Sequence, residues 1–133
     1  MPNVRSLNKD KYMMSMCRFR ELYYFCLQYG EWKQEIQNLN MLSSSKFDGV
    51  PRSNDISDST AKIAIKRAEL SQKCELIENT AYDVDFEIAK YILKAVTEGA
   101  NFNFLKTAMA IPCGRDRFYD SRRKFYWLLS RRL

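Results

Sequence analysis

The sequence predicts an all-α protein, and three observations support that fold class. Apolar residues recur at helical spacing in every patterned stretch of the 133 residues. No stretch alternates apolar and polar residues, as a half-buried strand would. Glycine, proline, serine and asparagine gather at a few interruptions between these stretches. We therefore expect a helical hairpin near the N-terminus and a unit of three helices near the C-terminus.

Residues 1–42 are predicted to form the helical hairpin. The first helix is expected over residues 9–28, because apolar side chains share one face there. These side chains are Tyr12, Met16, Phe19, Tyr23 and Cys26. Gly30 is expected to end or kink this helix, and a second, shorter helix follows over residues 31–41.

Residues 43–57 are interpreted as a linker or loop. Serine, glycine, proline, asparagine and aspartate dominate this stretch, and no apolar periodicity continues through it. An ordered functional loop is the alternative interpretation. The linker interpretation makes residues 58–133 a second, separately packed helical region.

The second region is predicted to open with a helix that Asp58 or Ser59 caps. One stripe of this helix has near-heptad spacing and consists of Ile63, Leu70, Cys74, Ile77, Ala81 and Val84. The stripe is either a core face or the seam of a coiled-coil dimer. On the neighbouring side, small residues allow another helix to approach closely; they are Ala61, Ala64 and Ala68.

Three further helices are predicted, over about residues 85–98, 101–110 and 114–132. Asp83 or Asp85 starts the first of them, and Gly99 follows its end as a left-handed cap. Asn101 or Asn103 caps the second. The order of a short helix, a Pro/Gly break and a longer helix is that of a helix-turn-helix unit.

The final helix is predicted to have two different faces. At 100° per residue, its core face consists of Phe118, Arg122, Phe125 and Leu129. Its opposite face carries Asp116, Asp120, Arg123, Lys124, Trp127 and Arg131. Tyr119 and Tyr126 flank one edge of the helix.

The positive charge of the chain is concentrated at its C-terminal end. The chain has 22 Lys and Arg against 16 Asp and Glu, a net charge of +6. From Asn101 onward there are eight Lys and Arg against two Asp, which is also +6. An excess confined to one end indicates a surface that binds a polyanion.

The composition argues against an enzyme. The chain has no histidine, which removes His-based general bases and every Cys/His zinc pattern. Its four glycines form no phosphate-binding loop. We expect a non-enzymatic protein without a cofactor or a metal site.

The sequence also gives no sign of membrane insertion or secretion. Its longest apolar runs are only a few residues, and charged residues interrupt the N-terminal stretch. The four cysteines form no CxxC pair and are expected to be reduced thiols. We expect a cytoplasmic protein that does not bind a membrane.

Double-stranded DNA is the expected partner of the final helix. Arg115 and Arg117 lie in its first turn, where a recognition helix meets base edges. The other candidate DNA-binding residues are Ser121, Arg123, Lys124 and Arg131. The alternative interpretation is a charged surface helix in contact with solvent.

Three aromatic residues of this helix are candidates for contact with a second copy or another protein: Trp127, Tyr119 and Tyr126. An exposed Trp favours a protein contact over base stacking. Alternatively, the helix over residues 9–28 covers Trp127. Cys113 lies beside two arginines at a helix start, which is expected to lower its thiol pKa, although such a cysteine more often only packs a turn.

Two stretches, Asp58 to Arg67 and Phe118 to Leu129, resemble a known family. Over about residues 48–133 the chain is similar to RinA-type and ArpU-type late-gene transcription regulators from phages and prophages of Gram-positive bacteria. The resemblance implies a sequence-specific DNA-binding regulator with a sigma-factor-like helix-turn-helix, and it adds RNA polymerase as a candidate partner. In this chain Pro112 to Gly114 lengthen the turn by about one residue.

Two other functions are compatible with the sequence. A small-terminase-like DNA packaging component also joins a helix-turn-helix to an oligomerising helical part. A phage protein that binds and modulates a host protein would use the basic helix against an acidic surface. A ring-shaped assembly would favour the first function, and binding that does not respond to DNA would favour the second.

Overall fold

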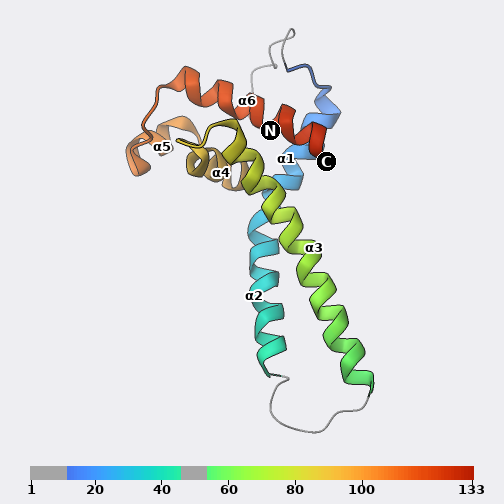
Figure 1. Cartoon of the computed structure of the whole chain (residues 1–133). Helices are drawn as coiled ribbons and strands as arrows, with labels where there is room; N and C mark the ends of the chain where they lie inside the picture. The colour runs from blue at the N-terminus through green and yellow to red at the C-terminus, as the bar shows by residue number, and fades with distance from the viewer. Residues whose placement is uncertain (1–11, 46–53) are drawn as a thin grey trace. The chain divides into compact units, whose positions relative to one another are not determined.

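The computed structural model (Figure 1) describes residues 12–45 and 54–133, and every regular element in them is a helix. The predicted all-α class is therefore confirmed for these residues. The six helices are α1 (Met16–Leu27), α2 (Tyr29–Ser45), α3 (Asn54–Val84), α4 (Ala89–Glu98), α5 (Phe102–Met109) and α6 (Arg115–Arg132). No helix among the described residues is long and apolar enough to cross a membrane.

The chain divides into two compact units. The terminal unit comprises Met1–Gln28 together with Leu76–Leu133, and the hairpin unit comprises Tyr29–Glu75. This division differs from the predicted one, which placed a hairpin in residues 1–42 and a linker in residues 43–57. The reason is that α1 packs with α4 and α6, whereas α2 pairs with the N-terminal part of α3.

The core of the terminal unit forms where α1, α4 and α6 meet. Each helix contributes side chains that are fully buried or nearly so, among them Leu22, Cys26, Ile92, Val96, Phe118, Phe125 and Leu129. The Phe19 ring meets the Tyr126 ring edge-on, with centroids 5.0 Å apart. Aromatic edge-to-face contacts add to the area that these rings bury.

The start of α1 lies later than predicted. Ser15 caps the helix by accepting a hydrogen bond of 3.1 Å from the Arg18 backbone N–H, so the helix begins at Met16. Residues 12–15 are not helical, and residues 9–11 lie outside the described residues. The break between α1 and α2 falls at Gln28, which leaves Gly30 inside α2.

The cap after α4 and the cap before α5 match the predictions, whereas the start of α4 does not. Gly99 follows α4 in the left-handed conformation, at φ 73°. Asn101 caps α5 by accepting from the Phe104 N–H at 2.9 Å. α4 itself begins at Ala89 rather than near Asp85, because the Asp85 carboxylate accepts from the Glu87 N–H and forms a turn there.

The connection between α5 and α6 is a tight turn. Ala110 ends α5 in the left-handed conformation at φ 54°, which a residue with a side chain rarely adopts. The turn places the Ile111 N–H 3.1 Å from the Leu105 carbonyl, which it donates to. Gly114 then precedes α6, which begins at Arg115, close to the predicted start.

In the hairpin unit, α2 and the N-terminal part of α3 run antiparallel (Figure 1). The Lys73 ammonium lies over the Trp32 ring at 5.2 Å, and the Arg67 guanidinium donates to Asn40 at 3.1 Å. α3 begins at Asn54, about four residues before the predicted cap, and α2 extends to Ser45. The predicted linker is therefore partly helical, and residues 46–53 lie outside the described residues.

The near-heptad stripe of α3 is a core face. Leu70, Cys74, Ile77 and Ala81 are each 3% exposed or less. Ile63 and Val84, at the ends of the stripe, are half-buried. Of the two interpretations of this stripe, the core face is the one that the structure bears out.

We predict that Phe118→Ala destabilises the chain by about 3–5 kcal/mol, because Phe118 is 0% exposed and its loss opens a cavity. Phe104→Ala is the matched control, since Phe104 is 45% exposed and should cost less than about 1 kcal/mol. Urea unfolding followed by circular dichroism measures both. Equal effects of the two variants would contradict the assigned core.

Candidate nucleic-acid interface

α6 is buried on one side only. Phe118, Phe125 and Leu129 are each 0% exposed and face the core. The Phe118 ring packs against the Phe102 ring of α5, at 5.9 Å between centroids. The predicted core face of this helix is confirmed, and it fixes which residues face outward.

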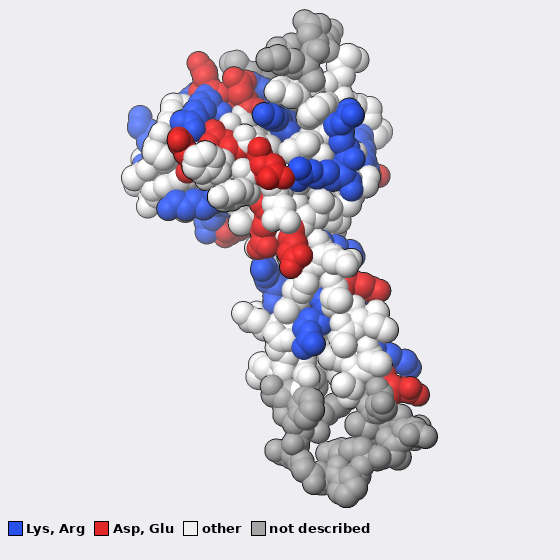
Figure 2. Space-filling view, viewed as in Figure 1, with Lys and Arg blue, Asp and Glu red and all other residues white. Residues whose placement is uncertain are grey.

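The outward face of α6 carries charges of both signs. Asp116, Asp120, Lys124 and Arg131 are exposed, while Arg123 and Trp127 are half-buried. On the face of the molecule in view in Figure 2, Lys and Arg side chains likewise lie among Asp and Glu side chains. The concentration of positive charge in the sequence therefore does not produce a uniformly basic surface.

Arg117 is held by two carboxylates at the turn between α3 and α4. Its guanidinium donates to both Asp85 oxygens, at 3.0 and 3.1 Å, and to Glu87 at 3.0 Å. These hydrogen bonds raise the pKa of Arg117 above its ordinary value, with Glu87 as the largest cause. Arg117, predicted to reach base edges, here fixes the first turn of α6 to the end of α3.

Two other arginines of the C-terminal region also have carboxylate partners. Arg132 donates to Asp83 at 2.7 Å and to the Thr80 hydroxyl at 3.1 Å, which joins the last turn of α6 to α3. Arg123 forms an ion pair with Asp120, one turn earlier on the same helix. The cations from Asn101 onward without a carboxylate partner among the described residues are Lys106, Arg115, Arg122, Lys124 and Arg131.

Arg115 lies at the junction of α5 and α6 with its charge uncompensated. Its guanidinium donates to the Asn103 side chain at 3.1 Å and lies over the Phe102 ring at 5.3 Å. Both partners belong to α5 and carry no charge. The contacts orient the arginine without neutralising it, so it can still bind an anion.

Arg122 is a half-buried cation among aromatic rings. Its guanidinium lies 4.8 Å from the Tyr119 ring centroid and 5.9 Å from that of Phe118. Its Nε is buried and has no hydrogen-bond partner among the described residues. Burial is the largest cause that lowers the pKa of Arg122 below its ordinary value, and the aromatic faces partly replace the lost water.

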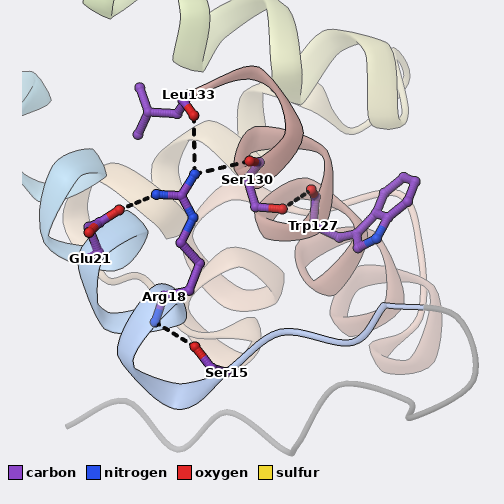
Figure 3. Close-up of polar contacts among 6 residues, drawn as sticks. All are labelled: Ser15, Arg18, Glu21, Trp127, Ser130 and Leu133. Carbon is purple, nitrogen blue, oxygen red and sulfur yellow. Dashed lines mark hydrogen bonds and ion pairs between the residues drawn. The ribbon is translucent and has the colours of Figure 1, made fainter.

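Arg18 of α1 caps the C-terminal end of α6 (Figure 3). Its guanidinium donates to the backbone carbonyls of Ser130, at 3.0 Å, and Leu133, at 3.2 Å, and also pairs with Glu21. A cation at a helix C-terminus satisfies free carbonyls and is favoured by the helix dipole. Sequence periodicity could not predict this contact, because Arg18 is separated from Ser130 by 112 positions in the sequence and from Leu133 by 115.

The three aromatic candidates have different environments. The Tyr12 ring packs on Trp127 at 5.5 Å, and the Arg131 guanidinium lies over the same ring at 5.1 Å. Figure 3 shows the chain before Ser15 running past the Trp127 side chain. The alternative interpretation was that the helix over residues 9–28 covers Trp127. The residue that packs on this ring is Tyr12, which lies before the start of α1.

Tyr126, a candidate for contact with a second copy or another protein, lies in the core of the terminal unit. It is 3% exposed and packs between the Phe19 and Phe125 rings. Burial raises the pKa of its hydroxyl far above the ordinary value. Tyr119 and Ser121 are half-buried on the two flanks of α6.

Cys113 does not have the lowered pKa that its position suggested. Desolvation raises its thiol pKa, and Asp85 adds to that rise, whereas Arg117 acts in the opposite direction. Burial therefore outweighs the opposing effect of the Arg117 charge at this thiol. The interpretation of Cys113 as a packed turn residue fits this result.

Comparison with known protein families, with characterised proteins and with solved structures finds no match to this chain. Among the described residues there is also no cluster of cysteine and acidic side chains that could hold a metal ion.

We predict that Arg18→Ala loosens the last turn of α6 and lowers the free energy of unfolding by roughly 1–2 kcal/mol, because two carbonyls lose a charged donor. Hydrogen exchange of the amides in residues 129–133 should speed up. Arg20→Ala is the control, since Arg20 is exposed on the same helix. If both variants exchange like the wild type, Arg18 does not cap α6.

We predict a fixed order of thiol alkylation in the folded chain. Exposed Cys17 reacts first and half-buried Cys113 more slowly, because a raised pKa leaves less thiolate. Cys26, whose pKa burial raises to about 12, and buried Cys74 react only after unfolding. Iodoacetamide labelling at pH 8 with mass spectrometry measures the order. Faster labelling at Cys113 than at Cys17 would show an activated thiol.

Proposed function

We propose that the chain binds double-stranded DNA, with α5, the turn 110–114 and α6 acting as a helix-turn-helix. The observation that carries the proposal is the one-sided burial of α6 after a tight turn, which leaves a complete helix face outward. A helix held from behind by a core, with its opposite face directed outward, is the arrangement that fits a major groove.

The proposed contacts are the cations that no acidic side chain outside α6 holds. Arg115 and Lys124 have no carboxylate partner among the described residues, and neither does Arg131. Arg123 is paired only with Asp120 of the same exposed face, and a phosphate can replace that partner. Arg117 serves in this proposal as a positioning residue that sets the angle of α6.

Within this proposal the chain is a phage or prophage regulator of late transcription. The support is the resemblance of residues 58–67 and 118–129 to the RinA-type and ArpU-type regulators. RNA polymerase would then be a further partner. DNA binding can be tested without assuming any of this.

A carboxylate on the outward face of α6 also affects the proposed DNA binding. Asp116 is exposed in the first turn of α6 and has no ion-pair partner among the described residues. Facing DNA, it would lie near phosphates and oppose binding. A carboxylate at such a place can favour a particular site, because it penalises close approach to every other sequence.

We predict that the full chain binds a random-sequence duplex with a log–log salt slope of about −3 to −4, since about four cations meet phosphates. Replacing Lys124 and Arg131 with Ala should flatten the slope by about two units, whereas Asp116→Asn should tighten binding. The control Lys66→Ala, in the hairpin unit, should change nothing. Fluorescence anisotropy at several salt concentrations measures all four proteins.

Two results would contradict the proposal. The first is no binding even at low salt, which would favour a protein partner for α6. The second is an equal loss of affinity in Lys66→Ala and in the α6 variant, which would mean that binding is spread over the whole charged surface.

A further inference from the structure

The N-terminal part of α3 presents an apolar strip to solvent. Ala61, Ala64, Ile65 and Ala68 follow the spacing i, i+3, i+4 and i+7, so they share one side of the helix. All four are exposed, and Ile65 is 59% exposed. We call these four residues the α3 strip. Three alanines around one isoleucine let another helix backbone approach closely.

The α3 strip lies away from the contact between α2 and α3. Arg67 meets Asn40 of α2, and Lys73 lies over Trp32. Leu70 is buried on the side of α3 that faces α2. Around the α3 axis, the residues of the strip lie about 120–220° from Leu70, at 100° per residue. It therefore belongs to a second side of α3 that no described residue of the hairpin unit covers.

The hairpin unit buries few apolar side chains of its own. Among its described residues only Trp32, Leu70 and Cys74 are buried. Small helical units with so little core commonly gain stability by association. An exposed isoleucine in the middle of a close-packing surface is a natural contact for such association.

The charges beside the α3 strip identify the partner. One flank carries Asp58, Lys62 and Glu69, which alternate in sign from one end to the other through the middle of the strip. If a second copy of α3 packs antiparallel across Ile65, a two-fold axis brings this flank against itself. Glu69 then lies opposite Lys62 of the second copy.

A parallel arrangement lacks this complementarity. It would set the charged flank against the other flank of the strip, which presents Thr60 and Ser71. The charged residue beside them, Arg67, is held by Asn40 of α2. The hairpin unit as a whole is neutral, with seven Lys and Arg and seven Asp and Glu, so two copies do not repel each other.

We propose that the α3 strip is the contact of a two-fold dimer, in which α3 packs antiparallel on α3 of a second copy of this chain. The inference goes beyond the proposed DNA binding and does not depend on it, because it concerns only the hairpin unit. It moves the expected dimer contact from the aromatic residues of α6 to α3.

The test is sedimentation velocity of the full chain without DNA. The wild type should dimerise with a Kd in the micromolar range or tighter, and Ile65→Glu should be monomeric at the same concentrations. Circular dichroism should show unchanged helix content, because residue 65 is exposed. Lys106→Ala is the control: it also lowers the net charge by one, at an exposed residue of α5, and should leave the dimer intact.

Charge reversal tests the antiparallel register. Lys62→Glu and Glu69→Lys should each raise the dimer Kd about tenfold, since both symmetry-related pairs become repulsive. The double variant carrying both changes should return to the wild-type Kd, because the pairs are again opposite in sign. A monomeric wild type would overturn the proposal and leave the strip to a different partner. A dimer that Ile65→Glu does not weaken, or a double variant that is not rescued, would also overturn it.

Discussion

The packing of one face of α6 against α1 and α4 is the constraint on which the rest of the terminal unit depends. Phe118, Phe125 and Leu129 are fully buried along that face, and together they hold α6 in place. The rotation of the helix about its axis is thereby fixed, because turning it would expose these side chains. Fixing that rotation also decides which charged side chains face outward. The candidate interface is thus a consequence of the core behind it.

The charges of α6 serve two different purposes in the fold. At its two ends, Arg117 and Arg132 bind carboxylates at the end of α3, and Arg18 of α1 binds its last carbonyls. These contacts position the helix and remove positive charge from the surface. Between them, Lys124 and Arg131 remain without a carboxylate partner among the described residues. This second group is available to a polyanion, together with Arg115 and with Arg123, whose only ion pair lies within α6.

The features that could be predicted from the sequence are those that depend on residues close together in the chain. Helical periodicity placed the core face of α6, and the Gly99 and Asn101 caps followed from backbone and side-chain chemistry within a few residues. Contacts between distant residues were not predictable in this way. The pairing of Arg117 with Asp85 and the burial of Tyr126 under Phe19 depend on how α1 and α3 pack on α6. The same limit explains why α1 was assigned to a hairpin with α2.

Amide hydrogen exchange of the full chain, with and without duplex DNA, tests the central claim most directly. The account predicts that the amides around Phe118 to Leu129 exchange slowest in the free chain, because this helix anchors the core. It predicts further that DNA protects α5, the turn and the first turns of α6, with no added protection in α2. Rapid exchange throughout α6 in the free chain, or DNA protection confined to the hairpin unit, would contradict the account.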